Sequence, residues 1–215
     1  TQIESDPSVH FFFFSEPLTR REREKNRRRE DILRAAEFVF AAKPFHAASL
    51  DEVAKKAEYA KGTIYLYFKN KEALFEQKID QMFRNVRGEV EDAKDFSGKL
   101  TALVHAQLDF AEKNAWFFRI FTQERMDVGD ELKRENWSHV YELYYEFLAF
   151  MGKVIAAGQA QGFLREGDTG RYALTLLGVV NITIRAWLEH QSSTSLVGQS
   201  DFITDFFLTG AAPSN

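Results

Sequence analysis

Residues 49–71, SLDEVAKKAEYAKGTIYLYFKNK, decide the fold of this chain of 215 residues. Ser49 stands three residues before Glu52, which is the capping-box pattern of a helix start. Apolar residues then recur at helical spacing, namely Leu50, Val53, Ala54 and Ala57. The segment Glu58–Tyr59–Ala60 is predicted to form a turn, and a second short helix is predicted over Lys61–Tyr67. Two short helices joined in this way indicate a helix-turn-helix.

In a helix-turn-helix the second helix enters the major groove of DNA, and the flanking residues contact phosphates. Gly62 would let the backbone approach DNA closely, and the methyl of Thr63 suits the methyl of thymine. Lys69 and Lys71 are expected to contact phosphate. The candidate DNA-binding residues are Ser49, Ala60, Lys61, Gly62, Thr63, Tyr65, Tyr67, Lys69 and Lys71. A purely structural role is the alternative for Ser49 and Tyr67.

Helical patterns precede and follow this stretch. The preceding helix carries one apolar face, which consists of Ile32, Leu33, Ala36, Val39 and Phe40, and Pro44 ends it. Asn70 is a suitable N-cap for the following helix. The buried face of that helix is predicted to hold Leu74, Phe75, Ile79, Met82, Phe83 and Val86. We therefore expect a DNA-binding domain over residues 20–87, after an N-terminal extension at 1–19.

The runs ILRAAEFVFA, SLDEVAKKA and above all KGTIYLYFKNKEALF resemble the TetR family of bacterial transcriptional regulators, of the TetR/AcrR type. The resemblance implies an all-α fold of about nine helices. In it, a three-helix DNA-binding domain precedes a larger ligand-binding and dimerisation domain, here residues 88–215. The family usually has Gly where this chain has Glu58, and Gly often follows the first helix where this chain has Pro44. A positive φ at Glu58 would cost about 1 kcal/mol.

Charge is distributed unevenly along the chain. Residues 18–87 carry 17 Lys and Arg against 11 Asp and Glu, whereas residues 88–215 carry 11 against 18. A basic N-terminal part joined to an acidic C-terminal part directs DNA to one end of the molecule. The densest basic run, RREREKNRRRE at 20–30, has two interpretations that the sequence leaves open. It is either an arm or helix start that touches DNA or a solvated helix face whose Glu residues pair locally.

The second half of the chain is predicted to be helical at about 99–113, 115–125, 131–161, 168–190 and 200–209, with a connector at 92–98. The helix at 168–190 is apolar nearly all round, which predicts burial on several sides. The helix at 200–209 is similarly apolar. The resemblance implies that these last two helices form a homodimer interface. A dimer places two recognition helices on one double-stranded DNA, so a palindromic operator is expected.

Aromatic residues are dense between residues 116 and 150. They are interpreted either as the lining of an effector pocket or as an aromatic core. Asn181 and Arg185 are polar groups on an apolar helix, so they would face a ligand or hydrogen-bond across the dimer. The candidate ligand-binding residues are Trp116, Phe117, Phe121, Tyr141, Tyr144, Tyr145, Asn181 and Arg185. His105 and Gln107 are weaker candidates.

Several chemistries are excluded or not expected. The chain has no Cys, which excludes thiolate metal sites and thiol redox sensing. Its five His show no paired metal spacing, and no phosphate loop or nucleophile elbow occurs. We therefore expect no catalytic residue, no metal and no cofactor. No apolar run is long enough to span a membrane, and the segment VHFFFF near the N-terminus lacks a basic leader, so a cytoplasmic protein is expected.

The combined prediction is a ligand-responsive transcriptional regulator that binds its operator as a homodimer and is released by a small hydrophobic or aromatic molecule. Repression is the mode that the resemblance implies. Two alternatives remain open at the level of sequence. One is an effector-independent architectural DNA-binding protein, which a core without a cavity would favour. The other is a helical lipid-binding module that keeps the helix-turn-helix as a scaffold.

Overall fold

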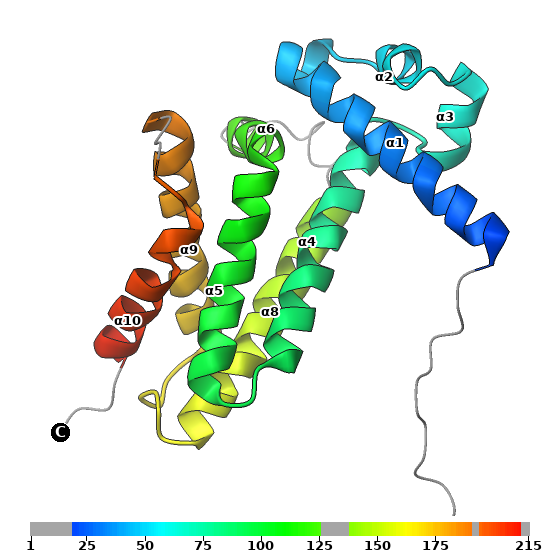
Figure 1. The fold of residues 1–215 in the computed structure, drawn as a ribbon. Coiled ribbons are helices and arrows are strands. Elements are labelled where there is room, and N and C mark those ends of the chain that lie inside the picture. The colour runs from blue at the N-terminus through cyan, green and yellow to red at the C-terminus, as the bar shows by residue number, and fades with distance from the viewer. Residues whose placement is uncertain (1–18, 126–137, 191–193, 212–215) are drawn as a thin grey trace, which may run out of the picture.

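The computed structural model describes residues 19–125, 138–190 and 194–211. Over these ranges it is all-α, as predicted, with nine α-helices and two short 3₁₀ helices (Figure 1). The α-helices are α1 (Arg20–Ala42), α2 (Leu50–Lys56), α3 (Lys61–Tyr67), α4 (Glu72–Asp92), α5 (Phe96–Lys113), α6 (Ala115–Arg125), α8 (Ser138–Ala160), α9 (Thr169–His190) and α10 (Ser200–Ala211). The 3₁₀ helices are η1 (Phe45–Ala47) and η2 (Val197–Gln199).

Helix α1 begins with a capping box, in which Thr19 accepts from the backbone N–H of Glu22 and the Glu22 carboxylate accepts from the backbone N–H of Thr19. The basic run at 20–30 is therefore the first part of a helix and is not an extended arm. The helix ends at Ala42, and Lys43 continues in an extended conformation before Pro44. This end agrees with the expected effect of Pro44.

The helix-turn-helix forms at the predicted residues. Ser49 and Glu52 make the capping box of α2, and α3 runs over Lys61–Tyr67. In the turn between the two helices, Glu58 has a φ of 58°, the one positive φ of a non-glycine residue among the described residues. The family's usual glycine would adopt this conformation without strain, so Glu58 costs the fold about 1 kcal/mol.

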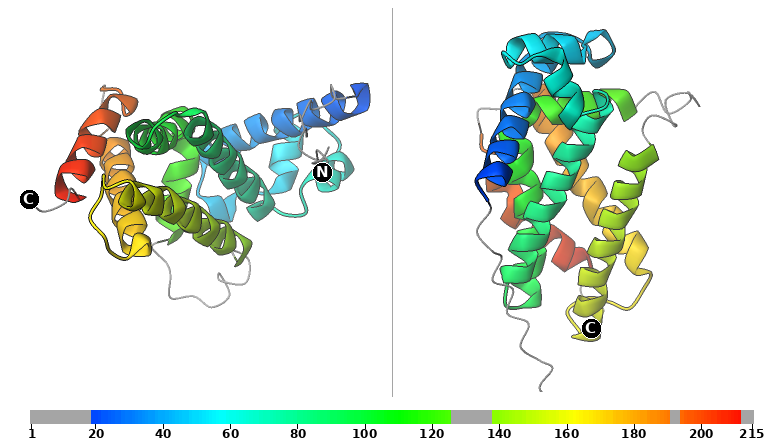
Figure 2. Two further views of the ribbon diagram at one scale, coloured as in Figure 1. Left: turned by 90° about the horizontal axis from the view of Figure 1, so that it is seen from below. Right: turned by 90° about the vertical axis from the view of Figure 1, so that its right-hand side faces the viewer.

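Helix α4 connects the head, residues 20–87, to the rest of the protein. The N-cap of α4 is Lys71, one residue after the predicted Asn70, but Asn70 Oδ1 accepts from the backbone N–H of Ala73 in the first turn at 2.9 Å. The helix then continues to Asp92 without interruption, past the boundary predicted at residue 87. Figure 2 shows α4 running from beneath the head down into the bundle formed with α5, α8 and α9. A displacement of α4 within the bundle would therefore move the head.

One boundary in the second half differs from the predictions, and another lies outside the described residues. The connector between α4 and α5 is shorter than predicted, because Asp95 accepts from the backbone N–H of Gly98 at 2.8 Å and starts α5 at Phe96. The predicted helix at 131–161 is described from Ser138 onward, and its first residues lie outside the described ranges.

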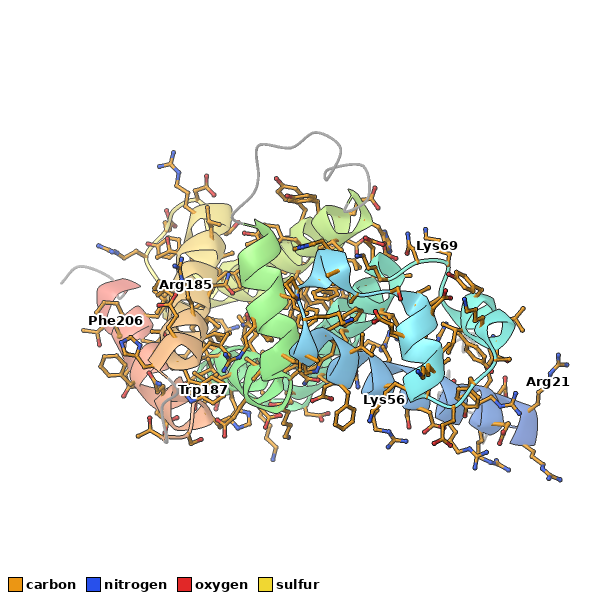
Figure 3. All side chains as sticks on the ribbon, turned by 90° about the horizontal axis from the view of Figure 1, so that it is seen from above. Arg21, Lys56, Lys69, Arg185, Trp187 and Phe206 are labelled. Atoms are coloured by element: carbon orange, nitrogen blue, oxygen red, sulfur yellow. The ribbon has the colours of Figure 1, made fainter. Side chains whose placement is uncertain are left out.

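The predicted burial of α9 on several sides is wrong for the single chain. One face of α9 is buried, but Leu174 and Ile182 on the other side are 53% and 60% exposed. On α10, Phe202 and Phe206 are 71% and 63% exposed. Phe206 points away from the bundle at the end opposite the head (Figure 3). Helical periodicity cannot distinguish a face that packs within the chain from an apolar face that stays exposed on the single chain.

Candidate DNA interface and effector cavity

Helix α3 is held by its apolar residues and presents its remaining surface outward. Ile64 and Phe68 are buried in the head, whereas Tyr65 and Leu66 are 52% and 84% exposed. Lys61 and Gly62 are exposed as well, and Thr63 is half-buried. A Cβ added at Gly62 would meet no atom within 4 Å, so packing within the chain does not require glycine there. This surface has the form that a recognition helix needs for close approach to a DNA groove.

The cation at the start of α3 has a partner within the chain. The Lys61 ammonium forms an ion pair with Asp51 of α2, and this hydrogen bond raises the pKa of Lys61. Ala60 is the N-cap of α3 and supplies no side-chain cap. Lys69 is exposed beyond the end of the helix and points outward on the head side of the molecule (Figure 3).

Lys71 and Ser49 have structural roles that the sequence did not fully reveal. The Lys71 ammonium donates to the carbonyls of Phe45, His46 and Ala48 at 2.7, 3.2 and 3.3 Å. It thereby holds η1 against the start of α4, and it has no need of a phosphate partner. The Ser49 hydroxyl caps α2. For both residues the DNA contact stays a prediction beside an observed structural function.

The basic run on α1 combines local ion pairs with a basic surface groove. Glu24 accepts from Arg27 and Arg28 at 3.0 and 3.1 Å, and these hydrogen bonds hold the pKa of Glu24 below its usual value. Local pairing is thus present. A groove nevertheless runs between α1 and the end of α3, and basic side chains outnumber acidic ones along it. Its lining residues are Arg21, Glu22, Glu24, Lys25, Arg28, Leu66 and Tyr67.

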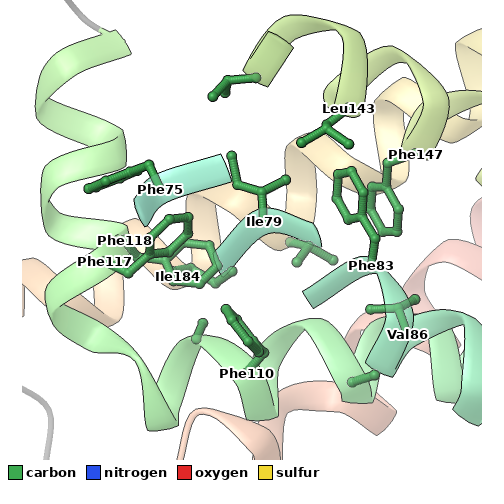
Figure 4. Packing of buried hydrophobic residues seen from close by; sticks show 14 of the residues in the cluster. Phe75, Ile79, Phe83, Val86, Phe110, Phe117, Phe118, Leu143, Phe147 and Ile184 are labelled. Atoms are coloured by element: carbon green, nitrogen blue, oxygen red, sulfur yellow. The ribbon is translucent and has the colours of Figure 1, made fainter. Parts of the chain in front are cut away.

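An apolar cavity lies between five helices of the bundle. It is lined by Ile79, Met82 and Phe83 of α4, Gln107 of α5, Phe117 and Phe118 of α6, Val140, Tyr144 and Phe147 of α8, and Leu177, Asn181 and Ile184 of α9. Its volume is about 40 Å³. The rings of Phe83 and Phe147 stack at 4.4 Å at one end of this region, and Phe117 and Phe118 lie at the other (Figure 4).

Three of the eight predicted ligand residues, Phe117, Tyr144 and Asn181, line this cavity. Trp116 does not, because its ring packs on Phe40 in the head at 5.9 Å. Arg185 pairs with Glu189 of its own helix at 2.7 Å.

Two further predicted residues also do not line the cavity, and one lies outside the described part. Tyr145 is 66% exposed. Tyr141 is half-buried but is not among the lining residues. The side chain of Phe121 lies outside the described part of the structure. These differences arise because a periodic pattern does not say which face of α6 or α8 turns toward the head, the cavity or the solvent.

The predicted ligand-binding residues omit other members of the cavity. Phe118 and Phe147 belong to the aromatic residues between 116 and 150 but are not among the predicted ligand-binding residues. Gln107 is a weaker candidate in that prediction. Met82 and Phe83 were predicted as core residues of α4. The signal that identifies them is the length of α4, whose apolar face continues beyond what the head alone can bury.

A chain of aromatic rings connects the cavity to the head. Phe117 packs on Phe75 with centroids 4.8 Å apart, and Phe75 packs on Trp116 at 6.2 Å. Trp116 in turn stacks on Phe40 of α1, and Phe75 meets Phe45 of η1 at 5.1 Å. These contacts form a continuous packed path from Phe117 to the core of the head.

The sequence matches two family descriptions. Residues 32–77 match bacterial regulatory proteins of the tetR family, and residues 75–210 match the C-terminal region of YsiA-like proteins. The chain belongs to the TetR family. The resemblance inferred from the helix-turn-helix is thereby confirmed, and so is the prediction of a DNA-binding transcriptional regulator that is not an enzyme.

Individual relatives are similar to this protein along most of its length. A fatty acid metabolism regulator protein of Bacillus subtilis is 26% identical over 83% of this TetR-family chain and 93% of its own length. The structure of the fatty acid degradation regulator FadR of Bacillus halodurans has a TM-score of 0.74 at 25% identity, covering 85% of this chain and 95% of that one. FadR of Bacillus subtilis in complex with stearoyl-CoA has a TM-score of 0.73 at 24% identity, covering 84% and 98%.

Two further observations concern the described residues alone. None of their helices combines the length and apolar character that a membrane span requires. They also contain no cluster of three or more His, Asp or Glu side chains that is arranged to hold a metal ion.

Proposed function

We propose that this TetR-family protein is a repressor that binds a palindromic operator as a homodimer and is released from it by an acyl-CoA. The observation that carries the proposal is the apolar cavity between α4, α5, α6, α8 and α9, whose rings pack directly on the core of the DNA-binding head. The relative whose structure contains stearoyl-CoA supplies the ligand class.

The size of the cavity explains how a ligand would act on DNA binding. The cavity volume of about 40 Å³ is far below the roughly 300–1,000 Å³ that is typical of ligand pockets. An acyl group can therefore enter only if the helices around the cavity separate. The ligand then binds an expanded bundle more tightly than the compact one, and this unequal affinity is the requirement for an allosteric effect.

The proposed route to the head runs through α4 and α6. Phe117 of α6 lines the cavity, and the neighbouring Trp116 packs in the head on Phe40. Helix α4 carries cavity-lining residues in its middle and begins directly after α3. Expansion of the cavity would shift both helices and change the separation of the two heads in a dimer, so that they no longer match two half-sites one DNA turn apart.

The DNA-binding half of the proposal rests on the exposed surface of α3. Lys61, Gly62 and Tyr65 point outward beside the half-buried Thr63, and the head carries the positive charge of the molecule. Lys69 and the groove beside α1 extend this basic surface. Electrostatic attraction would bring DNA to this end, and the α3 side chains would select the sequence.

The first experiment measures binding of the full chain to the DNA upstream of its own gene, at stated salt, with and without palmitoyl-CoA. The double variant Lys61→Ala, Tyr65→Ala should lose the footprint over a palindrome. Lys153→Ala, which removes an exposed cation on α8, should retain it. Addition of palmitoyl-CoA should weaken the wild-type footprint. The proposal fails if the saturated protein binds the operator as tightly as the ligand-free protein does.

A further inference from the structure

Besides Tyr144, which carries a phenol hydroxyl, two carboxamide side chains interrupt the apolar lining of the cavity. Gln107 of α5 is 2% exposed, and Asn181 of α9 is half-buried. A buried polar group without a hydrogen bond costs roughly 1–3 kcal/mol, and packing alone would be served better by Leu or Met. Within the described part of the chain, the Asn181 amide has no hydrogen-bond partner. Two amides on one small cavity therefore indicate that a polar atom belongs between them.

The orientation of the Gln107 amide is determined by its neighbour. Its Nε2 donates to the Leu103 carbonyl at 2.6 Å. The opposite orientation would place two oxygens against each other, since a carbonyl cannot donate. The atom left over is Oε1, a hydrogen-bond acceptor, and the amide's one hydrogen bond among the described residues is the bond to Leu103. A ligand group that binds against this side of the cavity is therefore favoured if it carries a hydrogen-bond donor.

This requirement distinguishes among acyl groups. A saturated chain offers no donor, and a thioester carbonyl offers only an acceptor, which Oε1 would repel. A hydroxyl group can donate to Oε1 of Gln107 and accept from the Asn181 amide at the same time. The surrounding rings would enclose the carbon skeleton on either side of that hydroxyl.

We propose that the effector is a hydroxyacyl thioester, with Gln107 as the acceptor for its hydroxyl and Asn181 as the second partner. This inference rests on the proposed function, because it specifies which acyl groups the same cavity selects. Sites that hydrogen-bond a hydroxyl discriminate against the analogue that lacks it, because the buried amides are then left unpaired. One such hydrogen bond corresponds to a preference of about tenfold.

The test compares three CoA thioesters of one chain length: the saturated form, the 3-hydroxy form and the form with a hydroxyl at the chain end. Their dissociation constants are measured calorimetrically with the full chain. The wild type should bind one hydroxylated form about tenfold more tightly than the saturated form. The Gln107→Met variant, which has a similar shape, should lose this preference and still bind the saturated form. Asn181→Leu should reduce it. Lys153→Ala, which changes an exposed side chain on α8 outside the cavity lining, should leave it intact.

Three results would contradict the inference in distinguishable ways. Equal or tighter binding of the saturated form by the wild type would show that the cavity does not select a hydroxyl. Equal weakening of all three ligands in Gln107→Met would assign Gln107 to the thioester or to the fold. Absence of binding by every thioester, with DNA binding intact, would overturn the proposed function itself.

Discussion

The contacts of single charged side chains separate stability from recognition in the head. Lys71 and Lys69 are two residues apart, yet the first is bound to three carbonyls and the second is exposed. Their sequence context alone suggested the same role for both. The structure assigns Lys71 to the junction of η1 and α4, and leaves Lys69 as the better candidate for a phosphate contact.

The Lys71→Met variant should destabilise the protein by about 1–3 kcal/mol, because carbonyls of η1 lose a charged donor. Lys69→Met should change the free energy of unfolding by less than about 0.5 kcal/mol. Urea denaturation of the two variants measures this difference. A stable Lys71→Met protein that fails to bind its operator would instead assign Lys71 to DNA.

Asp51 holds the Lys61 ammonium at the start of the recognition helix. Asp51→Asn removes this ion pair and one negative charge that would face the DNA phosphates. We expect tighter operator binding at low salt and a salt dependence steeper by about one unit of slope. Salt titrations of binding test this, with Asp109→Asn of α5, which pairs with Lys113, as the control. Weaker binding by Asp51→Asn would show that the pair positions Lys61 for a base.

At the scale of the elements, α6 is a short helix whose neighbouring side chains reach two different parts of the protein, the head and the cavity of the bundle. Trp116 lies in the head and Phe117 lines the cavity. The indole N–H of Trp116 is buried without a hydrogen-bond partner in the described structure. An unpaired N–H is costly at a well-packed site, so rearrangement of this contact in the proposed expansion of the bundle would break no hydrogen bond of the indole.

Trp116→Leu should therefore uncouple ligand binding from DNA release. The variant should be destabilised by about 1–3 kcal/mol but should still bind its operator. It should also bind acyl-CoA normally, since residue 116 does not line the cavity, while the loss of operator affinity on adding acyl-CoA should be smaller than in the wild type. Phe96→Leu, an equally buried aromatic change at the far end of α5, should keep full coupling. Full release in Trp116→Leu would exclude the aromatic route.

Lys78 connects α4 to the end of α5, where its Nζ donates to Asn114 Oδ1 at 2.9 Å. Burial lowers the pKa of Lys78 below 10.5, its usual value in an unfolded chain. The folded state therefore binds this proton less tightly than the unfolded state does. As pH rises toward 10.5 the folded state loses the proton first, and the free energy of unfolding increases. The wild type should thus gain stability relative to Lys78→Met between neutral pH and 10.5. A comparison with the exposed Lys153→Met, which should show no such gain, completes the test.

Local signals predicted the head well. The capping residue Ser49, the nearby Asn70 and the terminator Pro44 act on their own neighbours, so the second, third and fourth helices begin within one residue of where the sequence indicates. The aromatic residues of α6 and α8 were predicted less well. Their destination depends on how helices rotate against one another, and adjacent residues such as Trp116 and Phe117 go to different places.

At the scale of the whole molecule, opposite ends carry opposite surface properties. The basic head with Arg21 and Lys69 lies at one end, and Phe206 projects at the other (Figure 3). The exposed apolar residues of α9 and α10 are Leu174, Ile182, Phe202 and Phe206, and the last two rings stack on each other. Exposed apolar side chains grouped in this way are typical of an interface, and α9 also lines the cavity.

The Phe206→Asp variant should therefore convert a dimer into a monomer in analytical ultracentrifugation, because it would bury an unpaired carboxylate in the interface. Tyr145→Asp changes a side chain that is equally exposed, at 66%, but lies on α8, and it should remain dimeric. A monomer binds only one half-site, so the affinity of Phe206→Asp for the palindrome should fall by about a hundredfold or more, while its affinity for a single half-site stays that of the wild type. A Phe206→Asp protein that remains dimeric would place the interface elsewhere. The half-site measurement separates loss of dimerisation from damage to the head, since only damage to the head weakens binding to an isolated half-site.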